Sequence, residues 1–237
     1  MNNKKPFAFT MILVAAFLAG AVLGRITGSR ASSGPAAARA AEVDGAAILP
    51  LPGTALLAGV PDVRQSTGYS CGAAALQAVL ARWGTSERED RLIARLRSTP
   101  RNGTHPDDIV RVAREFGLRA DLREGLGLED LEAALARGTS VIVDLQAWRQ
   151  KQDLPWSETW DDGHYMVLLG MDERNLYFED PSLLGSLGYV PRREFLERWH
   201  DYEGDPPLDA KDRTYLRMAI FIRGEAPSSR PPFERVK

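Results

Sequence analysis

The sequence has very little cysteine, because Cys71 is the only one in 237 residues. A single thiol excludes an intrachain disulfide and a zinc site built on several thiolates. Histidine is also scarce, and His105, His164 and His200 lie far apart along the chain. The sequence also has no GxxxxGK[ST] loop for the phosphates of ATP. We therefore expect no metal and no other cofactor.

An excess of charge of either sign is absent too. The 30 basic and 32 acidic side chains are mixed along the chain and give a formal net charge of −2. This balance provides no electrostatic basis for binding nucleic acid. What the chain does have is 44% hydrophobic residues, which is enough to build the buried core of one globular domain.

The N-terminus carries a pattern typical of a targeting segment. Lys4 and Lys5 precede an uncharged stretch from Pro6 to Gly24, and a helix of that length rises about 28 Å, close to the hydrocarbon thickness of a bilayer. We expect a domain outside the cytoplasm, either anchored in the membrane or exported after cleavage of the segment. The predicted parts are a signal or anchor at 1–27, a flexible linker at 28–55, a folded domain at 56–225 and a disordered tail at 226–237.

Apolar residues at helical spacing dominate the first half of the domain. Ser70 is the expected N-cap of the first helix, which Cys71 opens and which ends at Gly84. Three further helices are predicted, after a capping box at Ser86–Glu89, from Thr104 to Gly117 and from Leu128 to Arg137.

The second half favours strands. A β-branched run from Ser140 predicts a strand buried on both faces, and two runs around the turn Glu173–Arg174 predict a hairpin. A short helix at 192–199 and one last strand at 214–223 complete the domain. Helices followed by antiparallel strands indicate an α+β fold, with a helical lobe that carries Cys71 packed against a sheet.

Cys71 lies where a thiol becomes reactive. The first turn of a helix offers free backbone N–H groups and the positive end of the helix dipole, and both stabilise a thiolate. The pKa of Cys71 is therefore expected to fall below its usual value of about 8.5. The alternative is a small, inert, buried side chain, which is the commoner role of a lone cysteine. Because small residues follow Cys71 up to Ala75, we interpret it as a candidate nucleophile.

A nucleophilic thiolate needs a partner that exchanges protons at neutral pH. His164 is the best candidate because it opens a strand beside the expected cleft, whereas the other two histidines are assigned local structural roles. The hairpin should return Asp180 to the end where His164 begins, so Asp180 is the expected acceptor that orients the imidazole. Asp161 and Asp162 are rival candidates for that role.

Two further features surround this candidate site. Gln65 lies six residues before Cys71, and its amide could join the backbone N–H of Cys71 in an oxyanion hole. The stretch 146–163, QAWRQKQDLPWSETWDDG, contains three tryptophans. It is either a packed surface loop or a lid or peptide-binding edge at the rim of the cleft.

Three stretches in combination resemble a known family. They are VPDVRQSTGYSCGAAALQAVL at 60–80, GTHPDDIVRVAREFGL at 103–118 and GHYMVLLGMDERNLYFEDPSLLGS at 163–186. Together they resemble papain-clan peptidases of family thirty-nine of the cysteine peptidases, which process bacteriocin precursors at a double-glycine leader. The resemblance implies a papain-like fold and a peptide or protein substrate. The best-known members of the family are fused to ABC exporter domains, and this sequence departs from them, so we expect a stand-alone peptidase domain at 56–225 with any exporter on a separate chain. The resemblance also implies the roles of nucleophile for Cys71, general base and acid for His164, orienting group for Asp180 and oxyanion donor for Gln65.

The expected function is that of a cysteine peptidase that works through an acyl-thioester intermediate. Two alternatives stay open. A thiol amidase or transpeptidase would use the same residues, and a non-catalytic peptide-binding domain would keep the scaffold without the reaction.

Overall fold

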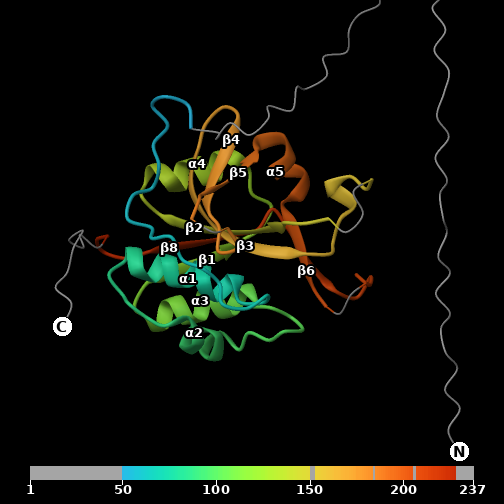
Figure 1. Cartoon of the computed structure of the whole chain (residues 1–237), viewed down its shortest axis with the longest axis horizontal. Coiled ribbons are helices and arrows are strands. Elements are labelled where there is room, and N and C mark those ends of the chain that lie inside the picture. Colours follow the sequence, from blue (N-terminus) through green and yellow to red (C-terminus); the bar gives the residue numbers. More distant parts are fainter. Residues whose placement is uncertain (1–49, 150–152, 184, 205–206, 228–237) are drawn as a thin grey trace, which may run out of the picture. The chain divides into compact units, whose positions relative to one another are not determined.

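The structure is a computed structural model that describes residues 50–149, 153–183, 185–204 and 207–227 (Figure 1). The predicted targeting segment at 1–27 lies outside the described residues. Among the helices that are described, none has the length and the apolar character that a membrane crossing requires. The predicted domain boundary at residue 56 stays a prediction. Residues before this boundary already contact the domain, because the N–H of Leu51 donates to Asp172 Oδ2, between β3 and β4, at 3.0 Å.

A six-stranded antiparallel sheet forms the centre of the domain, with the strand order β1-β8-β2-β3-β4-β5. Strands β6 and β7 pair separately as a two-stranded sheet. The strands are β1 Arg119–Arg123, β2 Ser140–Gln146, β3 Gly163–Met171, β4 Asn175–Glu179, β5 Gly188–Pro191, β6 His200–Glu203, β7 Arg213–Leu216 and β8 Ala219–Arg223. As predicted, the strand that begins at Ser140 is buried on both faces, and β3 and β4 form a hairpin.

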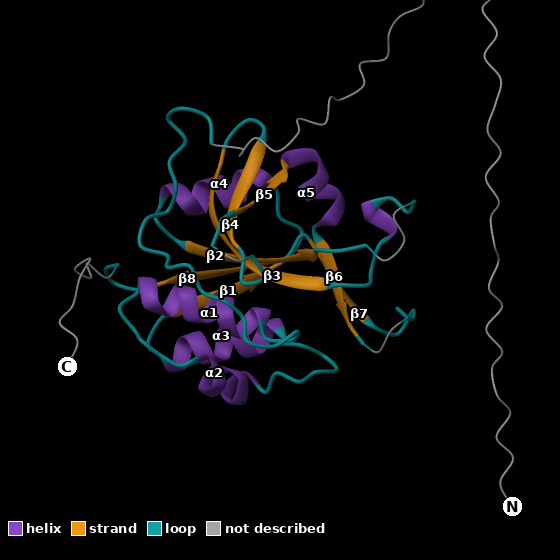
Figure 2. Ribbon diagram, in the orientation of Figure 1, coloured by secondary structure: helices purple, strands orange, loops and turns teal. Residues whose placement is uncertain are grey.

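Helices cover both faces of the six-stranded sheet (Figure 2). Alternate residues of β2 point to opposite sides, so Ile142 packs with the first three helices while Val141 and Val143 pack on the other face. The helices are α1 Cys71–Arg82, α2 Glu89–Leu96, α3 Pro106–Glu115, α4 Leu128–Ala136 and α5 Arg192–Arg198, with a 3-10 turn η1 at Trp156–Glu158. The α+β class and the helical lobe that carries Cys71 are confirmed.

Two sequence-based predictions of local structure were wrong. The second helix begins at Glu89 rather than at Ser86, without a side-chain cap. The carboxylate of Glu89 instead accepts a hydrogen bond from the N–H of Ser66 at 2.9 Å, so it holds the loop in front of α1.

The single last strand predicted at 214–223 is in fact two strands in two sheets. The chain bends at Arg217, which has a positive φ of 51° and whose N–H donates to Trp199 O at 2.9 Å. Strand β7 therefore pairs with β6, while β8 enters the central sheet between β1 and β2. Strands β1, β5 and β6 were not predicted.

Candidate active site

The first turn of α1 holds Cys71 at a fixed place between two layers. Ser70 occupies the N-cap position as predicted, but its hydroxyl accepts a hydrogen bond from the N–H of Thr67 at 3.1 Å instead of capping the helix. Gly72 lets α1 approach the loop before α3, because a Cβ at this position would lie 2.8 Å from Thr104 Cβ. The beginning of α1 is therefore packed closely against the chain around Thr104.

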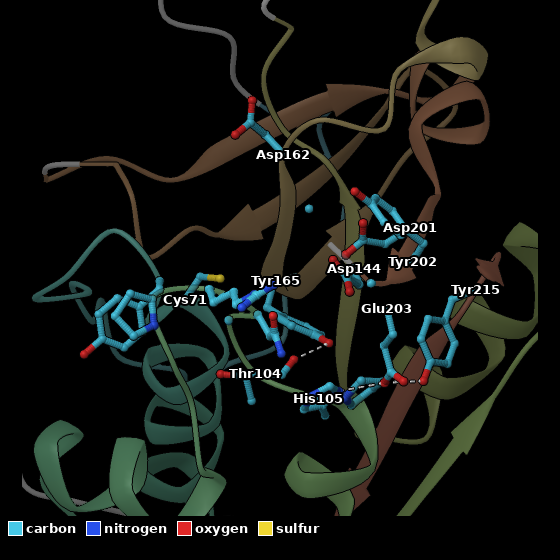
Figure 3. A pocket seen from close by; sticks show the side chains of 18 of the residues that line it. Cys71, Thr104, His105, Asp144, Asp162, Tyr165, Asp201, Tyr202, Glu203 and Tyr215 are labelled. Carbon is cyan, nitrogen blue, oxygen red and sulfur yellow. Dashed lines mark hydrogen bonds and ion pairs between the residues drawn. The ribbon is translucent and has the colours of Figure 1, made fainter. Parts of the chain in front are cut away.

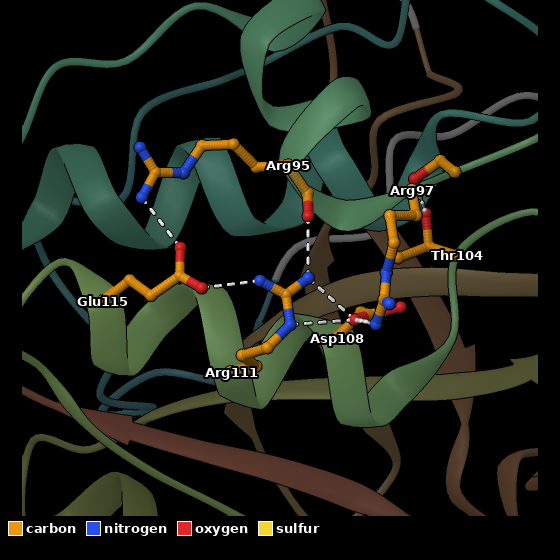
Figure 4. A network of polar contacts seen from close by, with 7 residues as sticks. Arg95, Arg97, Thr104, Asp108, Arg111 and Glu115 are labelled. Carbon is orange, nitrogen blue, oxygen red and sulfur yellow. Dashed lines mark hydrogen bonds and ion pairs between the residues drawn. The ribbon is translucent and has the colours of Figure 1, made fainter.

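A network of charged side chains fixes the loop that contains Thr104 (Figure 4). The guanidinium of Arg111 on α3 donates to Asp108 and Glu115 and to the carbonyl of Arg95 on α2. Arg97, at the end of α2, also pairs with Asp108. The ends of α2 and α3 are thereby tied together, so the loop between them forms a defined wall beside Cys71.

The structure brings Cys71, His164 and Asp180 together. His164 lies at the start of β3 with only 1% of its surface exposed, and its ring acts on the pKa of the Cys71 thiol as a hydrogen-bond and charge partner. Glu179 pairs with Val167, so Asp180 follows β4 at the end where β3 begins. His164 Nε2 donates to Asp180 Oδ1 at 2.7 Å, which leaves the other ring nitrogen, Nδ1, for the thiol.

Hydrogen bonds decide the charges in this group. Burial by itself would raise the pKa of Cys71, but His164 and the backbone N–H groups of Tyr165 and Gly72 outweigh it, so the pKa of the thiol is lowered. Burial would lower the pKa of His164, but hydrogen bonds with Asp180 and Cys71 raise it to about 9. The two pKa shifts therefore favour the thiolate of Cys71 and the imidazolium of His164 together.

Asp180 is held as a carboxylate despite its partial burial. Burial favours the neutral acid, yet the hydrogen bonds from His164 and from Ser182 lower the pKa of Asp180. Its Oδ1 accepts from the N–H and the hydroxyl of Ser182 at 2.8 and 2.7 Å. These donors fix the carboxylate, which in turn fixes the tautomer and the orientation of the imidazole.

The other candidate residues lie close by with different partners. His200 hydrogen-bonds with Thr159 O at 2.8 Å, and His105 Nδ1 pairs with Glu203 at 3.0 Å; both partners are distant in sequence, and the local structural roles of the two histidines stay predictions. Asp161 and Asp162 line a neighbouring pocket, while the partner of His164 is Asp180.

Gln65 belongs to a loop attached to the end of β4. The N–H of Val63 donates to Glu179 Oε1, and the N–H of Gln65 donates to Pro181 O, both at 3.1 Å. The side-chain Nε2 of Gln65 donates to Thr67 O at 2.8 Å, and its Oε1 is buried without a partner in the described part of the chain. The role of Gln65 as an oxyanion donor stays a prediction.

Trp148 brings the tryptophan-rich segment into contact with His164. Trp148 is 50% exposed, and its ring lies against that of His164, with 5.0 Å between the ring centroids. Trp156 stacks under the guanidinium of Arg198, and Trp160 packs on His200. Much of the segment is thus packed on the domain, while Trp148 covers the imidazole.

Sequence reasoning missed two acidic residues beside the thiol. A pocket of about 320 Å³ opens next to Cys71, and Asp144 of β2 and Asp201 of β6 both line it (Figure 3). Asp144 is the single charged residue in an apolar strand that was predicted to be buried on both faces, and this was the available signal. Nothing in the local sequence pointed to Asp201. Among the described residues, no group of three or more potential ligands is arranged to hold a metal ion.

Comparison with known proteins identifies relatives of this domain. The sequence model of the Peptidase_C39 like family matches residues 57–206. An uncharacterised protein of Methanothermobacter thermautotrophicus is 35% identical over 121 residues, which make up 51% of this chain and 71% of that protein.

Solved structures share the fold. A protein from Bacillus anthracis described as a C39-like peptidase matches with a TM-score of 0.55 and 18% identity, covering 73% of this chain and 98% of its own. The peptidase domain of Streptococcus ComA, a bifunctional ABC transporter of a quorum-sensing pathway, matches with a TM-score of 0.50 and 20% identity, covering 70% and 97%. These matches show the papain-like α+β fold that the sequence predicts.

Proposed function

The chain belongs to the Peptidase_C39 like family, and from this premise we propose that it is a cysteine peptidase with Cys71 as nucleophile. The observation that carries the proposal is the hydrogen-bonded series from the Cys71 thiol through His164 to Asp180. It supplies a nucleophile, a proton carrier and an orienting carboxylate in that order.

The reaction begins with the thiolate and imidazolium pair. Cys71 Sγ attacks the carbonyl carbon of the scissile peptide bond and forms a C–S bond. His164 gives its proton to the leaving nitrogen, the C–N bond breaks, and an amine product departs from an acyl-thioester. The neutral imidazole then takes a proton from water as its oxygen attacks the thioester. The C–S bond breaks, the acid product leaves, and the thiolate and imidazolium are restored.

The oxygen of the tetrahedral intermediate needs hydrogen-bond donors. The backbone N–H of Cys71 is one of the N–H groups that the first turn of α1 leaves free. The side chain of Gln65, in the loop before α1, is the proposed second donor after its amide turns from Thr67. Trp148 covers the imidazole and limits the access of water to the ion pair.

The function can be tested with a substrate mixture of unselected sequence. The full chain and its Cys71→Ala variant are incubated with a diverse peptide mixture in water enriched in ¹⁸O, and the products are measured by mass spectrometry. Hydrolysis predicts new C-termini that carry ¹⁸O with the native protein and none with the variant. Products joined to a second amine would instead support a transpeptidase. A lack of any product, together with a thiol that resists iodoacetamide below pH 8, would contradict the proposal and favour a binding domain.

We further propose that residues 1–27 carry the domain to the membrane, with the domain outside the cytoplasm. The support is the uncharged stretch from Pro6 to Gly24 behind Lys4 and Lys5. Fractionation of cells that produce the full chain should find it in the membrane pellet or outside the cytoplasm, and a chain lacking residues 1–27 should stay in the cytosol. A native chain found in the cytosol would overturn this assignment.

A further inference from the structure

The pocket beside Cys71 is strongly acidic. Its wall comes from the loop before α3, the start of β3, the inner strand β2 and strand β6 (Figure 3). Its carboxyl groups outnumber its basic groups, which are Arg101 and His105. The carboxyl groups are those of Asp144, Asp161, Asp162, Asp201 and Glu203. At about 320 Å³ the pocket has the size of the smallest ligand sites, which suits a single side chain.

Asp144 and Asp201 form a carboxyl pair on one side of this pocket. Asp144 is only 3% exposed, and its side chain is in hydrogen-bond contact with that of Asp201. Asp201 Oδ1 also accepts a hydrogen bond from Gln146 Nε2 at 3.0 Å. A side chain at position 163 would collide with Asp201 Oδ2, so Gly163 leaves the room in which this carboxyl group lies.

One oxygen of the buried Asp144 carboxyl group lacks a hydrogen-bond donor. Its Oδ1 is buried and has no hydrogen-bond partner among the described residues. The hydroxyl of the neighbouring Tyr165 contacts the Asp144 carboxyl group and also donates to Thr104 O at 3.1 Å. Both amide N–H groups of Gln146 are also in use, since Nε2 donates to His200 O as well as to Asp201. No described side chain therefore supplies a donor to Asp144 Oδ1.

Two carboxyl groups in contact need a positive charge between them, which is either a shared proton or a cation. Burial raises the pKa of Asp144 well above its usual value and that of Asp201 to about 6. In the absence of a ligand, the pair is therefore partly neutralised by a proton. An ammonium or guanidinium group brings both the charge and the N–H donors, and charge-assisted hydrogen bonds of this kind are among the strongest in proteins. Tyr202 and Tyr215 also line the pocket, and the guanidinium of Arg213 already lies over the ring of Tyr215.

We propose that Asp144 and Asp201 form a subsite for a cationic side chain, lysine or arginine, of the peptide next to the bond that Cys71 attacks. The inference rests on the proposed peptidase function and adds the chemical class of its substrate. Cys71 lines the same pocket as the carboxyl pair, so a side chain held there belongs to a residue close to the scissile bond. A glycine pair in the substrate offers no such side chain, and the preferred cleavage sequence therefore differs from a double-glycine site.

The first test compares arginine with citrulline, its uncharged isostere, in the full-chain protein. The probes are pairs of decapeptides, acetylated and amidated at their ends. The two members of a pair differ only by arginine or citrulline at one position, and this position and the surrounding sequence vary from pair to pair. We expect the native protein to cleave the arginine peptides at least tenfold faster at the preferred position. Asp201→Asn should reduce this preference to threefold or less, and so should Asp144→Asn. Equal cleavage of both peptides by the native protein, within threefold at every position, would overturn the subsite.

Controls separate charge recognition from damage to the fold. Asp121→Asn removes the same charge from β1, outside the pocket, and should keep the full preference for arginine. Thermal unfolding of each variant shows whether it is folded. A further set of peptides carries a free N-terminus. If cleavage required this terminal amine and did not require arginine, the pocket would bind an α-ammonium group, which would contradict the proposal.

A binding measurement keeps the subsite testable without catalysis. N-acetyl-arginine amide and N-acetyl-citrulline amide are titrated into the Cys71→Ala full chain and followed by calorimetry or NMR. The arginine compound should bind at least fivefold more tightly, and the difference should vanish when Asp201→Asn is added. Equal binding overturns the subsite whether or not peptides are cleaved. A preference in binding with no cleavage of any peptide by the native protein would retain the subsite and overturn the peptidase function instead.

Discussion

Two groups of acidic side chains lie on either side of the Cys71 and His164 contact, and their surroundings affect their charge in opposite ways. Asp180 accepts hydrogen bonds from His164 and Ser182, which lower its pKa in spite of burial. Asp144 faces another carboxyl group, so burial and repulsion raise its pKa. Burial is common to both sites, and the partners therefore decide whether a carboxyl group is ionised.

This difference corresponds to two kinds of task. Asp180 has its positive partner inside the protein and serves to orient that partner. Asp144 instead has the carboxyl group of Asp201 as its neighbour, and its Oδ1 has no donor among the described residues. An internal ion pair favours a fixed geometry, whereas two carboxyl groups that share a pocket are suited to a ligand that brings the positive charge.

Substitution at Asp180 should give the largest effect. Asp180→Asn removes the charge that raises the pKa of His164, so we expect kcat/KM to fall about 100-fold and the alkaline limit of activity to move to lower pH. The measurement is kcat/KM against pH on a peptide that the native protein cleaves, with Asp121→Asn as the control. An unchanged alkaline limit would mean that Asp180 does not act through the imidazole.

The pH dependence of the native protein should show the second largest effect. His164 has a pKa of about 9, so the imidazolium that protonates the leaving amine is lost as the pH rises through 9. Activity should then decline about tenfold for each further pH unit. The lowered pKa of Cys71 predicts that the rate of alkylation by iodoacetamide rises less than tenfold from pH 7 to 8. A rate that rises tenfold over that interval would indicate an ordinary thiol and contradict the ion pair.

The Asp144–Asp201 pair should give a smaller effect, which is seen in the pH dependence of the protein's stability. The folded-state pKa of Asp201, about 6, lies above its unfolded value of about 3.9. Its contribution to stability is complete below pH 3.9 and is lost as the pH rises through 6. The melting temperature of the native protein relative to Asp201→Asn should therefore fall by a few degrees between pH 4 and 7, since about 1 kcal/mol corresponds to roughly 2 to 4 °C. Cys71, Tyr165 and Glu203 face the pair in both proteins and therefore affect both melting temperatures. If the melting temperatures of the native protein and of Asp201→Asn changed in parallel with pH, the raised pKa of Asp201 would be contradicted.

The smallest effect is expected at Glu179, directly beside Asp180. Burial raises the pKa of Glu179 to about 8, so it is mostly protonated at pH 7. Glu179→Gln keeps a neutral group of the same shape and an oxygen that accepts from the N–H of Val63. Activity at pH 7 should therefore change less than threefold, in contrast to Asp180→Asn. A loss as large as that of Asp180→Asn would show that a charge on Glu179 is needed.

The elements predicted correctly are those whose signal is local. The apolar residues that predict α1 and α4 each lie within one short stretch of sequence. The hairpin of β3 and β4 is predicted by the turn between the two strands. The short strands β1, β5 and β6 were missed because their pairing depends on partners elsewhere in the chain. The break at Arg217 also depends on a distant group, since it is fixed by the carbonyl of Trp199.

The sequence by itself determined that a lone cysteine opens a helix, and that a hairpin brings a histidine and an aspartate to the same end of two strands. Both follow from helical periodicity and from the alternation along a strand, which are properties of short segments. Only the tertiary structure decided that Asp144 of β2 meets Asp201 of β6 beside the thiol. These two residues share no local pattern, and their contact exists because the central sheet and the two-stranded sheet pack together at that point.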